Sequence, residues 1–252
     1  MNTCALLLTS FLAFPLGAPG HRGLPQEAAA PAFICPPCGA ECHFTTYTKE
    51  GNCGGCGMKL VPLAGVPQVG VLLYPNTGLP ASMTVLALFS ASNAVRAFSV
   101  ADTNEPLRLG DALEVRPQFD FADAPALDVL VVPDGWGAWD DPLIVEWVKA
   151  SAAKARCVLA VGAGSVLLAK AGFLAGERVP GRRFLVEHGK ELAPGLTFDS
   201  DFDYRRAGKF FLARDAFAAL EASLAIVQEL AGDERARRTA EDFGYVWVPE
   251  KK

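Results

Sequence analysis

The sequence lacks two features on which membrane-spanning and nucleic-acid-binding proteins depend. No apolar run approaches the roughly 20 residues that a membrane helix requires. The Lys and Arg residues form no cluster and the formal net charge is −5, whereas phosphate binding needs a concentrated basic patch. There is no internal repeat and no low-complexity tract. These absences favour a globular protein with an acidic, solvated surface that does not bind nucleic acid.

The composition leaves room for one good-sized domain and a small appendage, since 51% of the 252 residues are hydrophobic and 20% are charged. Residues 1–20 hold a short apolar run that breaks at Pro15 and ends in small residues, which resembles a secretory signal with cleavage after Gly20. No Lys or Arg precedes the run, so an apolar, disordered start is the alternative. We expect a signal peptide over 1–20, a periplasmic or secreted protein, and an Ala/Pro/Gly-rich linker over 21–32.

Five of the seven cysteines gather in one short segment. Cys35-Pro-Pro-Cys38-Gly39 and Cys53-Gly-Gly-Cys56-Gly57 are two C-x-x-C-G motifs separated by fourteen residues. Turns of this kind aim backbone N–H groups at thiolates and place four sulfurs around one tetrahedral ion. The spacing therefore predicts a structural zinc site made by Cys35, Cys38, Cys53 and Cys56. Two disulfides are the alternative, which an exported protein would permit.

Cys42 and His43 lie between these motifs and leave several interpretations open. Either side chain can replace one of the four cysteines or bind a second, softer ion, and Cys42 can also be a spare loop thiol. Residues 51–62 resemble the heavy-metal-binding modules of bacterial copper and cation efflux proteins, which end in Cys-Gly-Met-x-Leu-x-Pro. Those modules carry Cys-Pro-Met-His where this chain has Cys-Pro-Pro-Cys. We expect a zinc-ribbon-like module over 33–62.

From Gln68 onward, near-continuous apolar strands alternate with amphipathic helices. This pattern is typical of a parallel sheet that is covered by helices on both faces. It predicts a three-layer α/β domain over 67–252. The expected strands are 69–74, 97–100, 127–132, 158–161, 196–198 and 209–212, and the expected helices are 80–95, 142–155, 165–171, 183–192, 216–231 and 233–243.

One strand of this pattern turns sharply into a helix of small residues at Val161-Gly162-Ala163-Gly164-Ser165. This is the build of a nucleophile elbow, in which a strained strand-to-helix turn presents a side chain to a cleft floored by backbone N–H groups. Here the tip is Gly162, which carries only hydrogen. The architecture of a catalytic site is therefore expected without its nucleophile.

Three segments of the domain carry a resemblance to the ThiJ/PfpI family, the superfamily of the Parkinson's-associated DJ protein and the class I glutamine amidotransferases. They are Val71-Leu-Leu-Tyr-Pro75, Asp128-Val-Leu-Val-Val-Pro-Asp-Gly-Trp-Gly137 and residues 161–174. The resemblance covers essentially the whole α/β domain. It implies a flavodoxin-like fold and a homodimer, for which Trp136 and Trp139 are candidate interface residues.

The resemblance also implies a catalytic cysteine at the position of Gly162. It implies an acid after the first strand, where residues 76–80 hold no carboxylate, and a histidine after the elbow helix, where residues 179–183 hold none. Cys157 lies about 16 Å from the elbow at about 3.3 Å per strand residue, so it is interpreted as a core residue. Without a nucleophile and a base, the chemistry of the family is not expected.

The residues left for ligand binding are the backbone donors of Gly135 and Ala163 and the side chain of Asp134, with Gly162 and Ser165 nearby. The ordinary interpretation of Asp134 is a turn aspartate, and that of Ser165 is helix capping or packing.

We therefore expect an exported, non-catalytic ThiJ/PfpI-like domain with a Cys4 zinc site, acting in ligand or metal binding or in protein association. The alternative is a hydrolase, hydratase or glyoxalase-like enzyme with another residue set. Transcription regulation, a third alternative, usually adds a helix-turn-helix domain, and none is recognised in the sequence.

Overall fold

The computed structural model describes residues 32–36, 42, 45–110 and 113–249. The predicted signal peptide and nearly all of the predicted linker lie outside this range, as do Cys38 and His43. Within it, the cysteine module forms a small antiparallel sheet in the order β2 (Thr46–Tyr47), β1 (Phe33–Ile34) and β3 (Val61–Pro62). Its buried cluster is built on Cys35, Cys53 and Leu60, so the module has very little apolar core.

The α/β domain is built on a seven-stranded sheet in the order β13-β14-β10-β9-β4-β5-β8. All neighbouring strands in it are parallel except β13, which pairs antiparallel with β14. The predicted parallel sheet is therefore confirmed, with one antiparallel edge. The strands are β4 (Gln68–Leu72), β5 (Arg96–Ala101), β8 (Phe119–Asp120), β9 (Val129–Val132), β10 (Cys157–Val161), β13 (Tyr204–Ala207) and β14 (Phe210–Ala213).

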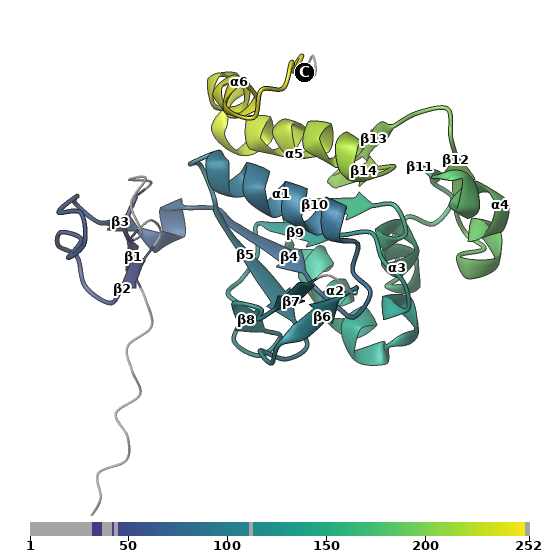
Figure 1. Ribbon diagram of the computed structural model, residues 1–252, viewed down its shortest axis with the longest axis horizontal. Coiled ribbons are helices and arrows are strands. Elements are labelled where there is room, and N and C mark those ends of the chain that lie inside the picture. The colour runs from purple at the N-terminus through teal and green to yellow at the C-terminus, as the bar shows by residue number, and fades with distance from the viewer. Residues whose placement is uncertain (1–31, 37–41, 43–44, 111–112, 250–252) are drawn as a thin grey trace, which may run out of the picture. The chain divides into compact units, whose positions relative to one another are not determined.

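Two layers of helices cover the faces of this sheet (Figure 1). Alternate residues of one strand point to opposite faces, as β9 shows: Val129 and Val131 join one core cluster, and Leu130 and Val132 join the other. The first cluster includes residues of α1 (Leu79–Ala91), α5 (Ala216–Ala231) and α6 (Asp233–Asp242). The second includes residues of α2 (Pro142–Lys154) and α3 (Gly164–Lys170). The three-layer architecture is confirmed.

Smaller elements extend this frame. A hairpin of β6 (Leu107–Leu109) and β7 (Leu113–Val115) follows β5, and the parallel pair β11 (Arg178–Pro180) and β12 (Thr197–Asp199) flanks α4 (Arg183–Leu192) in sequence. Two short 3-10 turns, Leu63–Gly65 and Ala138–Asp140, complete the described elements. Among the described residues, no helix is both long and apolar enough to cross a membrane.

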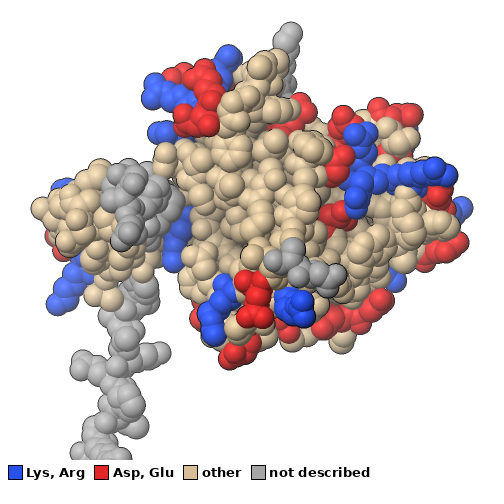
Figure 2. Space-filling model, viewed as in Figure 1, with Lys and Arg blue, Asp and Glu red and all other residues tan. Residues whose placement is uncertain are grey.

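The charged surface agrees with the sequence. On the face shown in Figure 2, Lys and Arg side chains lie beside Asp and Glu side chains where they gather, as over α6. Arg238 and Glu234 on that helix form an i,i+4 ion pair.

The strand order locates the region where a ligand pocket is expected. From β4 the chain moves outward to β5 and then returns to the other side of β4 for β9, β10 and β14. The direction of strand addition therefore reverses between β4 and β9. In open parallel sheets, the loops after the two strands at such a point diverge and leave a crevice outside their carboxyl ends.

Candidate functional site

The predicted elbow is present at the end of β10. Gly162 has φ +53°, a left-handed backbone that costs other residues about 1–2 kcal/mol. Its N–H donates to the carbonyl of Ala213 at the end of β14 (2.8 Å), which fixes the turn against the neighbouring strand. Ala163 then starts α3 as its N-cap. The strand-turn-helix geometry of the elbow is therefore complete although the tip carries no side chain.

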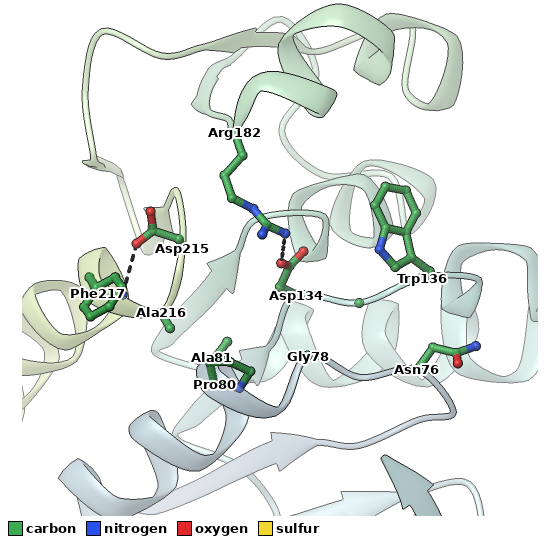
Figure 3. A pocket seen from close by; sticks show the side chains of 11 residues that line it. Asn76, Gly78, Pro80, Ala81, Asp134, Trp136, Arg182, Asp215, Ala216 and Phe217 are labelled. Carbon is green, nitrogen blue, oxygen red and sulfur yellow. Dashed lines mark hydrogen bonds and ion pairs between the residues drawn. The ribbon is translucent and has the colours of Figure 1, made fainter. Parts of the chain in front are cut away.

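The carboxylate of Asp134 fills this elbow. Asp134 follows β9, and its Oδ1 accepts a hydrogen bond from the backbone N–H of Ala163 at 2.9 Å. A Cβ placed on Gly162 would lie 2.6 Å from the same Oδ1, far inside normal contact distance. The second carboxylate oxygen pairs with the guanidinium of Arg182 (Figure 3). The space for an elbow side chain is thus held by a carboxylate from the adjacent strand.

Arg182 is a site residue that the sequence did not single out. It follows β11 and directly precedes α4, and its side chain extends toward Asp134 across the pocket (Figure 3). The Arg182 side chain is 51% exposed while that of Asp134 is 14% exposed, so the pair lies at the mouth of the elbow. The available signal was a Pro-Gly-Arg-Arg run at 180–183. It shows a loop with two cations and says nothing about which carboxylate they meet.

A cavity of about 470 Å³ opens beside the Asp134–Arg182 pair. Its walls come from the loops after β4, β9 and β14, together with Arg182, so it lies at the carboxyl ends of the strands where the reversal of strand order places it. Figure 3 shows the side chains around it. The lining residues are Asn76, Gly78, Pro80, Ala81, Asp134, Gly135, Trp136, Arg182, Asp215, Ala216 and Phe217.

Asp215 contributes a second carboxylate to this pocket, and it is fixed by a structural role. It caps α5 by accepting hydrogen bonds from the N–H groups of Phe217 (3.0 Å) and Ala218 (3.1 Å). Burial opposes its charge, but the N–H of Ala218 and the side chain of Arg214 outweigh burial and hold the pKa of Asp215 below its usual value. Asp215 is therefore an anion in the pocket wall.

Two aromatic side chains flank the pocket with large exposed areas. Trp136 is 42% exposed and Phe217 is 82% exposed. Trp136 also packs edge-on against Phe184 of α4 and against Trp139, with ring centroids 4.9 and 5.6 Å apart. The pocket therefore combines an ion pair, an anion and an apolar rim. Asp215 and Phe217 were not among the sequence-derived candidates.

Gly135 has a steric reason to be glycine. A Cβ on it would lie 2.7 Å from both the carbonyl oxygen of Asn76 and the ring of Tyr74. Gly135 pairs with Thr77 across the two loops, and the N–H of Gly78 donates to the carbonyl of Asp134 at 2.7 Å. This close approach joins the β4 loop to the β9 loop and thereby positions Asp134.

Tyr74 supports the same region from within the core. Its hydroxyl donates to the carbonyl of Pro133 at 2.8 Å. Burial raises its pKa well above the usual value, and the negative charge of Asp134 raises it further. The hydroxyl therefore stays protonated and acts as a hydrogen-bond donor.

The sequence-derived candidates have different places in this site. Asp134 and Gly135 line the pocket, whereas Gly162 and Ala163 lie behind the Asp134 carboxylate. The expected donor of Ala163 is already taken by Asp134. Ser165 was expected to cap the helix or to pack: it is buried, which fits packing, whereas α3 has no side-chain cap and the Ser165 hydroxyl has no hydrogen-bond partner among the described residues. The N-cap position falls two residues earlier, at Ala163.

Cys157 is confirmed as a core residue. It is fully buried in β10, and burial, followed by the charge of Glu229, raises the pKa of its thiol to about 11. His188 lies in α4, as expected, with its ring 4.9 Å from that of Phe184. Neither side chain lines the described pocket beside Asp134.

The cysteine module brings thiols together at a distance that suits a metal. The Sγ atoms of Cys35, Cys42, Cys53 and Cys56 all lie within 4.8 Å of one another. A tetrahedral zinc with Zn–S bonds of about 2.3 Å needs sulfurs about 3.8 Å apart. The Cys35–Cys56 separation of 3.5 Å is close to this value and well beyond a disulfide bond of about 2.05 Å. Cys38, which the sequence placed in this set, lies outside the described residues.

The surroundings of Cys53 favour its thiolate. The hydroxyl of Tyr47 lies 3.2 Å from its Sγ. This hydrogen bond, helped by the backbone N–H of Cys56, lowers the pKa of Cys53 to about 6. Thiolates are the form that binds metal, so the described cluster fits a soft divalent ion.

Comparisons with known proteins identify the family of the α/β domain. The model of the DJ-1/PfpI family matches residues 79–192. An isonitrile hydratase of Pseudomonas putida is 30% identical over 189 residues, which cover 72% of this chain and 80% of that protein. The chain belongs to the DJ-1/PfpI family. The residues that the family model matches include Asp134, Gly162 and Arg182.

Solved structures of DJ-1/PfpI proteins share the fold of this chain. A family member from Pseudomonas syringae has a TM-score of 0.64 at 21% identity, covering 74% of this chain and 78% of that one. DJ-1beta of Drosophila melanogaster has a TM-score of 0.62 at 18% identity, covering 72% of this chain and 99% of that one. At these identities the likeness concerns the fold, and it confirms the expected flavodoxin-like architecture.

Proposed function

We propose that the α/β domain binds a small molecule in the pocket beside Asp134 and Arg182 and does not perform the thiol chemistry of its family. One observation carries this proposal. The Asp134 carboxylate accepts the hydrogen bond of Ala163 and lies where a nucleophilic side chain on Gly162 would stand.

The lining of the pocket supports binding over covalent catalysis. Covalent catalysis needs a nucleophile and a base within hydrogen-bond reach of each other. Among the described residues that line the pocket, none is Cys, Ser, Thr, Lys or His. Asp215, which lies on the wall, is engaged in capping α5.

The same residues indicate the chemistry of the ligand. The guanidinium of Arg182 is half-exposed and offers hydrogen-bond donors to a polar group. Trp136 and Phe217 offer exposed aromatic surface on the rim. A small molecule with a polar, hydrogen-bond-accepting end and an apolar body suits this combination.

Turnover by the purified full-length protein tests the proposal. We expect no conversion of isonitriles, glyoxals, amides or peptides above the blank rate. Thiol alkylation is expected to leave ligand binding in the pocket unchanged, since no thiol lines it. Turnover that Asp134→Asn abolishes would instead show that the catalytic group has moved to Asp134.

That outcome defines the second candidate function, a hydratase with a carboxylate base. It is favoured by the likeness to an isonitrile hydratase and by the position of Asp134 in the elbow. In such a reaction, Asp134 would take a proton from water as the water oxygen attacks the isonitrile carbon, and would return that proton to the carbon. Transfer of the remaining hydroxyl proton to nitrogen would then give the N-substituted formamide. Appearance of that formamide, lost in Asp134→Asn and retained in Arg183→Gln, would establish this candidate.

We also propose that the cysteine module holds one zinc ion in a structural site. The clustered thiols and the scant apolar core support this role, because a module of about 30 residues rarely folds without a metal or disulfides. Metal analysis of protein purified under reducing conditions is expected to find about one tightly held zinc per chain. Peptide mapping that pairs these cysteines in disulfides would contradict the site.

We also propose that the protein is exported. The apolar N-terminal run supports export, and N-terminal sequencing of protein recovered from cells is expected to start at His21.

We further propose that the α/β domain forms a homodimer. The exposed rings of Trp136 and Phe184 support this, because adjoining exposed aromatic side chains are typical of interfaces. Light scattering that gives a monomer mass at micromolar concentration would contradict the dimer.

A further inference from the structure

We infer that Cys42, which lies between the two C-x-x-C motifs, is a ligand of the metal in the cysteine module. The inference rests on the proposed metal site and names its fourth ligand. With Cys42 in the shell, Cys35, Cys42, Cys53 and Cys56 complete a tetrahedral set among the described residues.

The backbone holds Cys42 beside Cys35. The N–H of Cys35 donates to the carbonyl of Thr45 at 2.8 Å, and the N–H of Thr45 donates to the carbonyl of Cys42 at 3.0 Å. Thr45 thus links Cys42 to Cys35, which directly follows β1, through two backbone hydrogen bonds. The backbone at Cys42 is therefore held close to that of Cys35.

The opposite motif leaves space for Cys42 in particular. A Cβ placed on Gly55 would lie 2.8 Å from the Cβ of Cys42 and 3.0 Å from its Sγ. A Cβ placed on the adjacent Gly54 would meet nothing within 4 Å. Neither glycine has a positive φ, so Gly55 is needed for space and not for its backbone conformation. The Cys53–Cys56 turn is thus shaped around the Cys42 side chain.

The chemistry of the set suits a closed structural site. Four thiolates carry more negative charge than one divalent ion neutralises, so the site needs hydrogen-bond donors to the sulfurs. Tyr47 supplies a hydroxyl at 3.2 Å from the Sγ of Cys53. A shell filled by four protein sulfurs leaves no open position for a substrate or water.

A serine variant of the full-length protein tests the ligand assignment. Zinc retention against a competing chelator is measured for the wild type and Cys42→Ser, and cobalt substitution reports the thiolate-to-metal absorption. We expect Cys42→Ser to weaken zinc retention by about tenfold or more and to reduce the thiolate-to-cobalt band. Wild-type retention and an unchanged cobalt band in Cys42→Ser would overturn the assignment.

Glycine variants test it without removing any thiol. Gly55→Ala pushes its methyl group against Cys42 and is expected to weaken zinc retention, whereas Gly54→Ala is the matched control and is expected to behave as the wild type. Equal retention in the two variants would contradict the inference. A wild-type protein that holds no zinc would overturn the metal site itself, whereas wild-type-like zinc in Cys42→Ser would overturn the assignment of Cys42 alone.

Discussion

The cysteine module and the α/β domain relate fold and chemistry in opposite ways. The module has a cluster of ligand side chains but a buried core built on Cys35, Cys53 and Leu60. The α/β domain has two extensive cores and an intact elbow, but its tip is Gly162. In the first region, a bound metal is expected to stabilise the fold, so losing the cysteines is expected to lose the structure. In the second, the buried cores provide the stability, so the scaffold does not depend on a side chain at Gly162.

Metal removal is the largest expected effect and tests this contrast directly. Chelation of zinc should unfold the module, because metal binding contributes on the order of 10 kcal/mol in small zinc peptides. The α/β domain should keep its helical circular dichroism signal. Hydrogen exchange, measured separately for the cysteine module and for the α/β domain, tests both expectations. Equal loss of protection in residues 33–62 and in the sheet strands would show that the two regions do not differ in this way.

Restoring the side chain at the elbow is expected to have the next largest effect. Gly162→Cys should lower the free energy of unfolding by about 2–4 kcal/mol, because it adds a left-handed non-glycine residue and a clash with the Asp134 carboxylate. Thermal or denaturant unfolding measures this change.

The matched control for that variant removes the clash. Gly162→Cys with Asp134→Gly is expected to recover part of the lost stability, because the carboxylate no longer occupies the elbow. The acid that the resemblance places after the first strand cannot simply be added at Gly78 to accompany the new cysteine, since a Cβ there would lie 3.1 Å from the carbonyl oxygen of Asp134. If Asp134→Gly adds to the destabilisation in place of relieving it, the carboxylate is not what excludes the elbow side chain.

Much of the fold follows from local sequence patterns. Helix α5 has the predicted bounds because Asp215 caps its start and Gly232, with a positive φ, follows its end. Strands β11 and β13 were missed because they are short and partly exposed, so they lack an apolar run. The spacing of the cysteines likewise predicted a metal module but not the place of Cys42.

The candidate site also combines residues whose position the sequence predicts with residues whose position it does not predict. Gly162, Asp134 and Gly135 stand next to predicted strands, so their position at the sheet edge follows from the chain. Arg182 and Asp215 come from loops distant in sequence, and their meeting with the β9 loop depends on tertiary packing that no local pattern reports. Even the clash at Gly162 depends on where the neighbouring strand places a carboxylate.

A smaller effect is expected at Asp215, which belongs to the fold although it lines the pocket. Asp215→Ala should cost about 1 kcal/mol at neutral pH through loss of the α5 cap. The folded-state pKa of Asp215 is lowered, so its charge contributes stability above the unfolded pKa of about 3.9, and this contribution is lost as pH falls through the folded pKa. The difference between wild type and variant in chemical denaturation should shrink with acid. A gap that stays constant down to about pH 2 would show that the carboxylate charge plays no part.

The smallest expected effect on stability concerns the Asp134–Arg182 pair, and it separates binding from folding. The half-exposed Arg182 side chain limits the coupling energy of the pair to about 1 kcal/mol or less in a double-mutant cycle of Asp134→Asn and Arg182→Gln. Arg183→Gln is the matched control, because Arg183 is 89% exposed and pairs only with Glu187 on its own helix among the described residues. Ligands of the pocket, found by thermal-shift screening, should bind more weakly to Arg182→Gln while Arg183→Gln binds them as the wild type does. Equal binding by both variants would show that the guanidinium of Arg182 serves only the fold. Ligand recognition would then depend on the rest of the pocket lining, including the exposed rings of Trp136 and Phe217.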